Sequence, residues 1–123
     1  MSSNKLDIEK ELEKKQTQIR RGVLELCILS IIAEEEVYPT DIINKLKESQ
    51  LIVKEGTMYP LLTRLKNAGL LHYNWRESTT GPPRKYYHIT ELGQEFLQGL
   101  LETWNNLVAV VDTTTKNLTK AKK

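Results

Sequence analysis

Basic side chains gather in one stretch of this 123-residue chain. The net charge is only +2 at neutral pH, so the whole-chain charge alone does not indicate an anionic partner. Residues 54 to 90, however, contain two acidic residues, Glu55 and Glu77, and six basic ones, namely Lys54, Arg64, Lys66, Arg76, Arg84 and Lys85. Cations at this density bind phosphates, which indicates a nucleic acid as the partner.

The same stretch changes its apolar period partway along. Up to Gly69 the apolar residues recur at helical spacing, from a start near Gly56 or Thr57. Beyond it the period becomes two, residues 78 to 83 are rich in turn formers, and residues 84 to 89 return as a second strand. A helix followed by a basic hairpin predicts a winged helix-turn-helix, in which the helix enters the major groove and the hairpin meets the adjacent backbone or minor groove.

We expect contacts with DNA from two groups of residues. The first begins the predicted helix, whose N-H groups and dipole favour phosphate, and continues along it: Lys54, Thr57, Tyr59 and Arg64. The second lies at the hairpin tip, where a glycine allows close approach and cations follow: Gly81, Arg84 and Lys85. A solvated helix face is the alternative for Arg64 and Lys66, and a generic surface hairpin is the alternative for the tip.

Patterns that carry catalysis are absent from the sequence. It has no glycine-rich phosphate loop, no nucleophile elbow and no cysteine or histidine spacing of a structural zinc site. His72 and His88 come near each other if the two strands pair, but two imidazoles lack the third and fourth ligands of tetrahedral zinc. We therefore expect no enzyme, no metal and no cofactor, with metal-responsive regulation through this histidine pair as a remaining alternative.

Four further helices are expected around this unit. Residues 4 to 18 form a charged helix that needs a partner surface, residues 19 to 33 a core helix, and a short helix begins at Pro39. Thr90 is suited to cap a final helix. The predicted fold is mainly α with a small β-hairpin, organised as an N-terminal helix at 1–18, a winged helix-turn-helix domain at 19–90, a C-terminal dimerisation helix at 91–115 and a basic tail at 116–123.

The final predicted helix carries an apolar stripe too long for a small domain to bury. Its members are Leu92, Phe96, Leu100, Trp104, Leu107 and Val111. A second copy of the chain is the simplest cover, because C2 dimers are the common outcome for such stripes. Trp104, with Leu100 and Leu24, is the expected site of a planar aromatic effector, since a flat ring at a dimer seam can stack on one. A plain interface anchor is the alternative for Trp104.

Cysteine content and hydropathy indicate a cytoplasmic protein. Cys27 is the single cysteine, so no disulfide can form within the chain. The longest apolar run, residues 26 to 33, is far shorter than the roughly 20 residues that a bilayer requires, so we expect no membrane partner.

Several motifs resemble the PadR-like transcriptional regulators. They are residues 56 to 62 (GTMYPLL), 64 to 65 with 69 to 70, 81 to 87 (GPPRKYY) and 89 to 93 (ITELG). The resemblance implies a cytoplasmic homodimer, usually a repressor, that binds an inverted-repeat DNA operator and releases it when an effector binds. With a single helix after the wing, the chain resembles the short-tailed subfamily, in which that helix and the N-terminal segment form the dimer interface and a tryptophan lines a ligand cavity.

Two positions depart from the family pattern. Residues 38 to 41 (YPTD) stand where the family often has His-Gly-Tyr-Glu, and position 83 is a second proline that stiffens the hairpin. A protein interaction module that uses the winged fold without contacting DNA is the alternative function, and the salt dependence of binding separates the two.

Overall fold

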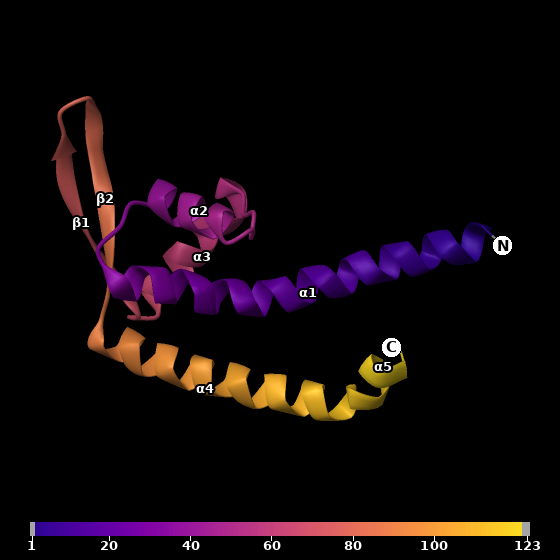
Figure 1. Ribbon diagram of the computed structural model, residues 1–123. Coiled ribbons are helices and arrows are strands. Elements are labelled where there is room, and N and C mark those ends of the chain that lie inside the picture. Colours follow the sequence, from indigo (N-terminus) through magenta and orange to yellow (C-terminus); the bar gives the residue numbers. More distant parts are fainter. Residues whose placement is uncertain (1, 122–123) are drawn as a thin grey trace.

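The chain folds into helices arranged around one hairpin, as the sequence predicts. The computed structural model describes residues 2–121. Its elements, in chain order, are α1 (Ser2–Glu34), α2 (Pro39–Glu48), α3 (Glu55–Asn67), β1 (Leu71–Ser78), β2 (Gly81–Ile89), α4 (Glu91–Thr114) and α5 (Lys116–Ala121) (Figure 1). The predicted fold class, a mainly helical winged helix-turn-helix, is confirmed.

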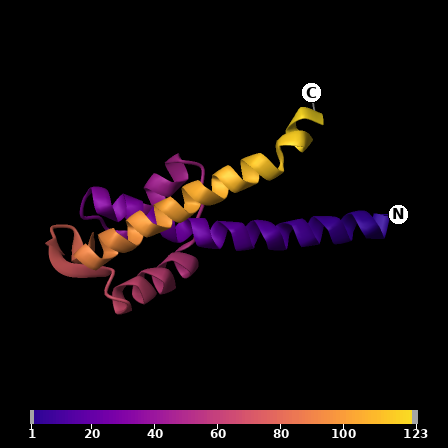
Figure 2. The ribbon, with the colours of Figure 1, turned by 90° about the horizontal axis from the view of Figure 1, so that it is seen from below.

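Helix α1 joins two segments that the sequence pattern separates. The expected helices at 4–18 and 19–33 are one continuous helix, because no proline or turn signal interrupts the chain between them. They differ in exposure instead. Residues 4–22 are exposed, whereas most of the apolar residues that follow are buried or half-buried in the domain. The N-terminal half of α1 therefore projects beyond the rest of the domain, as Figure 2 shows.

The hydrophobic core lies where α1, α2 and α3 meet the base of the hairpin. Its fully buried side chains include Ile28, Leu29, Ile32, Ile42, Met58, Leu62 and Leu65. Burying an apolar side chain of this size contributes about 1.5–3 kcal/mol. This shared core holds α3 and the hairpin in one orientation relative to each other.

The hairpin extends out of the core. Strands β1 and β2 pair antiparallel, with Leu71 opposite Ile89 at the base and Ser78 opposite Gly81 at the tip. Val37 adds an isolated bridge to Tyr87, with backbone hydrogen bonds in both directions. This bridge ties the turn between α1 and α2 to β2.

A tight junction sets the direction of α4. Gly69 has a φ of +82° and ends α3 as a left-handed cap. The Thr90 hydroxyl donates to the Gly69 carbonyl at 2.7 Å and accepts from the Gly93 N-H at 2.9 Å, so the predicted N-cap is formed. Gly93 lies against the Leu70 carbonyl so closely that an added Cβ would be 2.1 Å from its oxygen.

The C-terminal part continues as helix beyond the junction. Helix α4 passes beside α1, and the two ends then diverge (Figures 1 and 2). Where the sequence predicts a basic tail at 116–123, residues 116–121 form the short helix α5, and Lys122 and Lys123 lie outside the described residues. Within residues 2–121, no helix has the length and hydropathy needed to cross a membrane.

Candidate nucleic-acid interface

A cleft of about 480 Å³ lies between α3, the start of α2 and the hairpin. Tyr59 of α3 faces Arg84 and Lys85 of β2 across it. The remaining lining residues are Tyr38, Pro39, Thr40 and Trp75. No carboxylate lines the cleft, so its two cations face an otherwise neutral surface. Three of the seven residues predicted to contact DNA thus lie together here.

Two arginines lie opposite each other on one face of the hairpin. Arg76 and Arg84 are cross-strand partners, and like charges in that position are destabilising. Each guanidinium is held over an aromatic ring, Arg76 at 4.0 Å from the Tyr86 centroid and Arg84 at 4.9 Å from that of Tyr38. Such cation–π contacts offset part of the repulsion. The cation–π contacts therefore help to keep Arg76 and Arg84 side by side on the hairpin despite their repulsion.

A contact between Tyr38 and Tyr86 connects this face of the hairpin to the turn before α2. The rings of Tyr38 and Tyr86 have centroids 3.9 Å apart. The pKa of Tyr86 is raised above its ordinary value, chiefly because a hydrogen bond with Tyr38 favours the neutral phenol. The Asp41 carboxylate accepts from the Tyr38 backbone N-H at 3.2 Å, which fixes that residue at the start of α2. The hairpin and α2 are thereby connected through the rings of Tyr38 and Tyr86.

Arg76 differs from the other hairpin cations in having a carboxylate partner. It forms an ion pair with Glu36, in the turn that follows α1. Within the described residues, Arg84 and Lys85 form no ion pair. Lys85 instead lies over Tyr73 and Trp75, at 4.6 and 5.4 Å from their centroids. Arg84 and Lys85 are therefore available to an external anion, whereas Arg76 is already neutralised.

Trp75 lies further from the core than its strand pattern suggests. The alternation through Tyr73 and Trp75 predicts one half-buried face, yet 62 % of Trp75 is exposed. Only the base of β1 reaches the core, because the hairpin is longer than the layer of helices that supports it. Trp75 thus adds an exposed ring to the mouth of the cleft.

The other predicted contacts lie elsewhere. Lys54, Thr57 and Arg64 line a second cavity, between α1 and α3. Arg64 donates to the Glu25 carboxylate of α1 at 2.8 Å. Helical geometry explains the division, because positions 57 and 64 lie on one flank of α3 and position 59 on the other. Gly81 is at the exposed hairpin tip, where an added Cβ would meet nothing within 4 Å.

The sequence argument did not predict the roles of Tyr38 and Tyr86. Tyr86 belongs to one of the PadR-like motifs and Tyr38 to a departure from them. The two rings meet beside the Val37–Tyr87 bridge, which joins the residues next to them in the sequence. His72 and His88 do face each other, with ring centroids 5.1 Å apart. Among residues 2–121 no third histidine, cysteine or carboxylate joins them.

The residues predicted for dimerisation are largely exposed. They lie along α4, and Leu92, Phe96, Trp104, Leu107 and Val111 are each at least 39 % exposed, whereas Leu100 packs partly against the core. Of the predicted effector residues, Leu24 is buried and lines the cavity between α1 and α3, which neither Leu100 nor Trp104 lines. The three residues therefore do not form one cavity within a single chain.

Comparison with known proteins places this geometry in a family. The model described as the transcriptional regulator PadR-like family matches residues 28–99. A solved PadR-like transcription factor from Bacteroides fragilis is 52% identical, with a TM-score of 0.71, over 82% of this chain and 98% of that one. A PadR-family regulator from Eggerthella lenta is 28% identical, with a TM-score of 0.80, over 89% and 96%. An uncharacterized protein from Lysinibacillus sphaericus is 30% identical over 79% of this chain and 92% of its own length. The chain belongs to the PadR-like family of transcriptional regulators, and is thus a DNA-binding regulator and not an enzyme.

Proposed function

We propose that the protein is a cytoplasmic repressor that binds an inverted-repeat operator as a homodimer. The observation that carries this proposal is the cleft in which Tyr59 of α3 faces Arg84 and Lys85 of the hairpin. In a winged helix-turn-helix, the helix reads base edges in the major groove while the hairpin holds the adjacent backbone. We assign the first task to Tyr59 and the second to the two cations.

The homodimer is supported by two exposed apolar surfaces. Along α4, the exposed residues include Phe96, Leu107 and Val111. Along the N-terminal half of α1 they are Leu6, Ile8, Leu12 and Ile19, each more than half exposed. An isolated helix as polar as this half of α1 is marginal in water, so it gains stability from a partner. Packing against the α4 of a second copy covers both surfaces in one symmetric contact.

The effector we propose is a small planar aromatic molecule that stacks on Trp104. The ring of this residue is 39 % exposed on α4, next to the half-buried Leu100. A second copy is needed to enclose such a site. A ligand lodged between the two α4 helices releases the operator if it binds better to a dimer whose hairpins have a different spacing. Tryptophan fluorescence titrated with planar aromatic compounds tests this site, and a Trp104→Ala protein that still released DNA with the same ligand would contradict it.

Salt dependence is the test of DNA binding. The affinity for duplex DNA, measured by fluorescence anisotropy, should fall steeply with salt, and Arg84→Ala should reduce the slope of log K against log salt by about 1.8 for a dimer, at about 0.9 per phosphate contact. Lys47→Ala is the control, because this exposed lysine of α2 does not line the cleft. A flat salt response with both proteins would favour a protein interaction module instead.

A further inference from the structure

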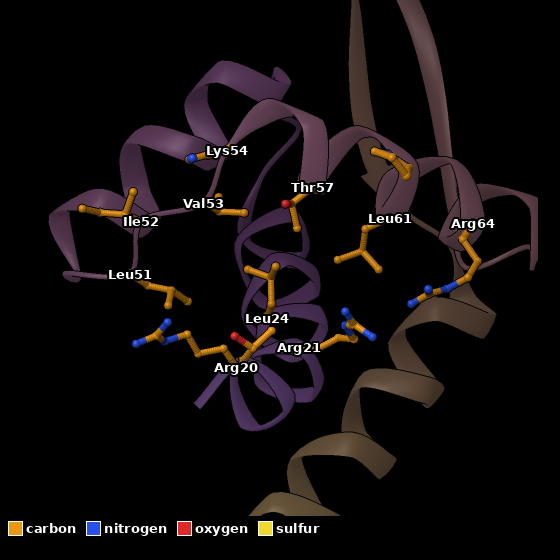
Figure 3. A pocket seen from close by; sticks show the side chains of 12 residues that line it. Arg20, Arg21, Leu24, Leu51, Ile52, Val53, Lys54, Thr57, Leu61 and Arg64 are labelled. Atoms are coloured by element: carbon orange, nitrogen blue, oxygen red, sulfur yellow. The ribbon is translucent and has the colours of Figure 1, made fainter. Parts of the chain in front are cut away.

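A second cavity, of about 360 Å³, lies on the other flank of α3. Its walls are α1, the connection at residues 51–54 and the first turns of α3. Figure 3 shows side chains of these three segments around the cavity, with the guanidinium of Arg20 on one side of Leu24 and that of Arg21 on the other. The volume lies at the lower end of the range for small-molecule sites. The cavity shares no lining residue with the cleft beside the hairpin.

Four cations are among the residues that line this cavity. Arg20 and Arg21 extend from α1, Lys54 precedes α3, and Arg64 lies further along α3. In Figure 3, the guanidinium groups of Arg21 and Arg64 point toward each other. None of the 12 lining residues is acidic. Glu25 neutralises Arg64 from outside the cavity, while the other three cations form no ion pair with any residue that the structure describes.

The floor of the same cavity is apolar. Leu24, Val53 and Leu61 are each less than 10 % exposed and direct their side chains into it (Figure 3). Leu51 and Pro60 complete the floor. A phosphate alone is satisfied by cations and N-H groups and gains nothing from such a floor. An apolar body, by contrast, is stabilised there in proportion to the apolar surface removed from water.

We propose that this cavity binds a small amphipathic carboxylate, with the apolar body on the leucine floor and the carboxylate against the guanidinium of Arg21. Guanidinium groups suit this ligand because they bind a carboxylate through two parallel hydrogen bonds. The net positive charge of the rim excludes cations and makes neutral ligands of the same shape bind more weakly.

Binding at this cavity has a consequence for α3. Lys54 and Thr57 belong to the cavity wall and to the start of α3 at once. A bound carboxylate therefore holds the first turn of α3 against α1 and changes the affinity for DNA, a consequence that rests on the proposed function. The binding itself does not rest on it.

Calorimetry with the full-length protein in the absence of DNA tests the site. The probes are octanoate and octanamide, which have the same number of non-hydrogen atoms and differ in charge. We expect octanoate to bind about tenfold or more tightly than octanamide, since a hydrogen bond to a charged group is the stronger kind. Arg21→Gln should weaken octanoate binding about tenfold and leave octanamide binding unchanged. Lys47→Gln removes the same charge from α2, away from the cavity, and should alter neither.

Four results would overturn the proposal. One is the absence of octanoate binding to the wild-type protein. Another is equal affinity for octanoate and octanamide. The third is an Arg21→Gln protein that binds octanoate as the Lys47→Gln protein does. If octanoate binds as expected while no DNA binding is measurable, carboxylate binding at this cavity is supported and the proposed function is contradicted. If Arg21→Gln instead lowers the salt slope of DNA binding as Arg84→Ala does, the rim is a phosphate site and the proposal fails.

Discussion

Removing the carboxylate of Glu36 should strengthen DNA binding. This residue neutralises Arg76, which lies opposite Arg84 on the hairpin and is stacked on Tyr86. The Glu36→Gln protein keeps the cation–π contact that positions the guanidinium and loses only the competing anion. Arg76 then becomes available to a DNA phosphate beside Arg84, without a change in the fold of the hairpin.

The size of the effect follows from the number of phosphates gained. One additional contact per subunit gives two per dimer, which steepens the slope of log K against log salt by about 1.8. Between 50 and 200 mM salt this amounts to an additional loss of affinity of about tenfold, so the variant has its largest advantage at low salt. The cost to folding is small, about 0–1 kcal/mol, because the ion pair is partly exposed to water.

Fluorescence anisotropy with an operator duplex, repeated over a range of salt concentrations, measures this slope. Glu35→Gln is the matched control, because it removes the same charge from the adjacent position while its partner, Lys45, lies on α2. We expect a steeper slope for Glu36→Gln and a much smaller change for Glu35→Gln. Equal slopes for the two variants would show a general charge effect, and a slope for Glu36→Gln no steeper than wild type would refute the release of Arg76.

Three further predictions concern the fold and the dimer. Gly93→Ala should lower the free energy of unfolding by about 1–3 kcal/mol, because its Cβ would overlap the Leu70 carbonyl. Gly99→Ala is the control and should not destabilise the protein, because a Cβ there has nothing within 4 Å. Denaturant unfolding of the two variants measures the difference. Phe96→Asp should shift the protein from dimer to monomer in sedimentation velocity, because it places a charge in the proposed seam. Burial raises the pKa of the Cys27 thiol, so alkylation by iodoacetamide should be slower than that of a free cysteine at pH 8 and should accelerate as the pH rises through the raised pKa.

Each of these predictions can fail in a specific way. A Gly93→Ala protein as stable as Gly99→Ala would mean that the junction between α3 and α4 adjusts without cost. A dimer that survives Phe96→Asp would place the seam elsewhere on the molecule. Alkylation of Cys27 at the rate of a free thiol would contradict its burial.

Sequence periodicity predicts α3 and the hairpin because both are local patterns. Helix α3 ends and strand β1 begins around Gly69, where the apolar spacing changes from helical to alternating. The N-cap at Thr90 is also formed as expected. The continuity of α1 is less evident, because its two halves differ in hydropathy while neither contains a helix terminator. Exposure changes along this helix, and secondary structure does not.

The candidate site is only partly predictable from sequence. The sequence predicts a single DNA-contacting surface from the basic and hydroxyl residues between 54 and 90. A helix, however, presents different flanks to different neighbours, and sequence order alone does not separate these flanks. Thr57 and Arg64 therefore face α1, whereas Tyr59 faces the hairpin. The contact between Tyr38 and Tyr86 depends on the Val37 bridge, which joins residues distant in sequence and has no local signature.

Selection of bound sequences from random duplex DNA tests the central claim most directly. The arrangement of Tyr59, Arg84 and Lys85 in a symmetric dimer predicts an enriched inverted repeat. Its half-site centres should lie about one helical turn apart, roughly 34–36 Å, or a multiple of it. Recovery of a single unrepeated site, or no enrichment over the starting pool, would contradict operator binding by a homodimer.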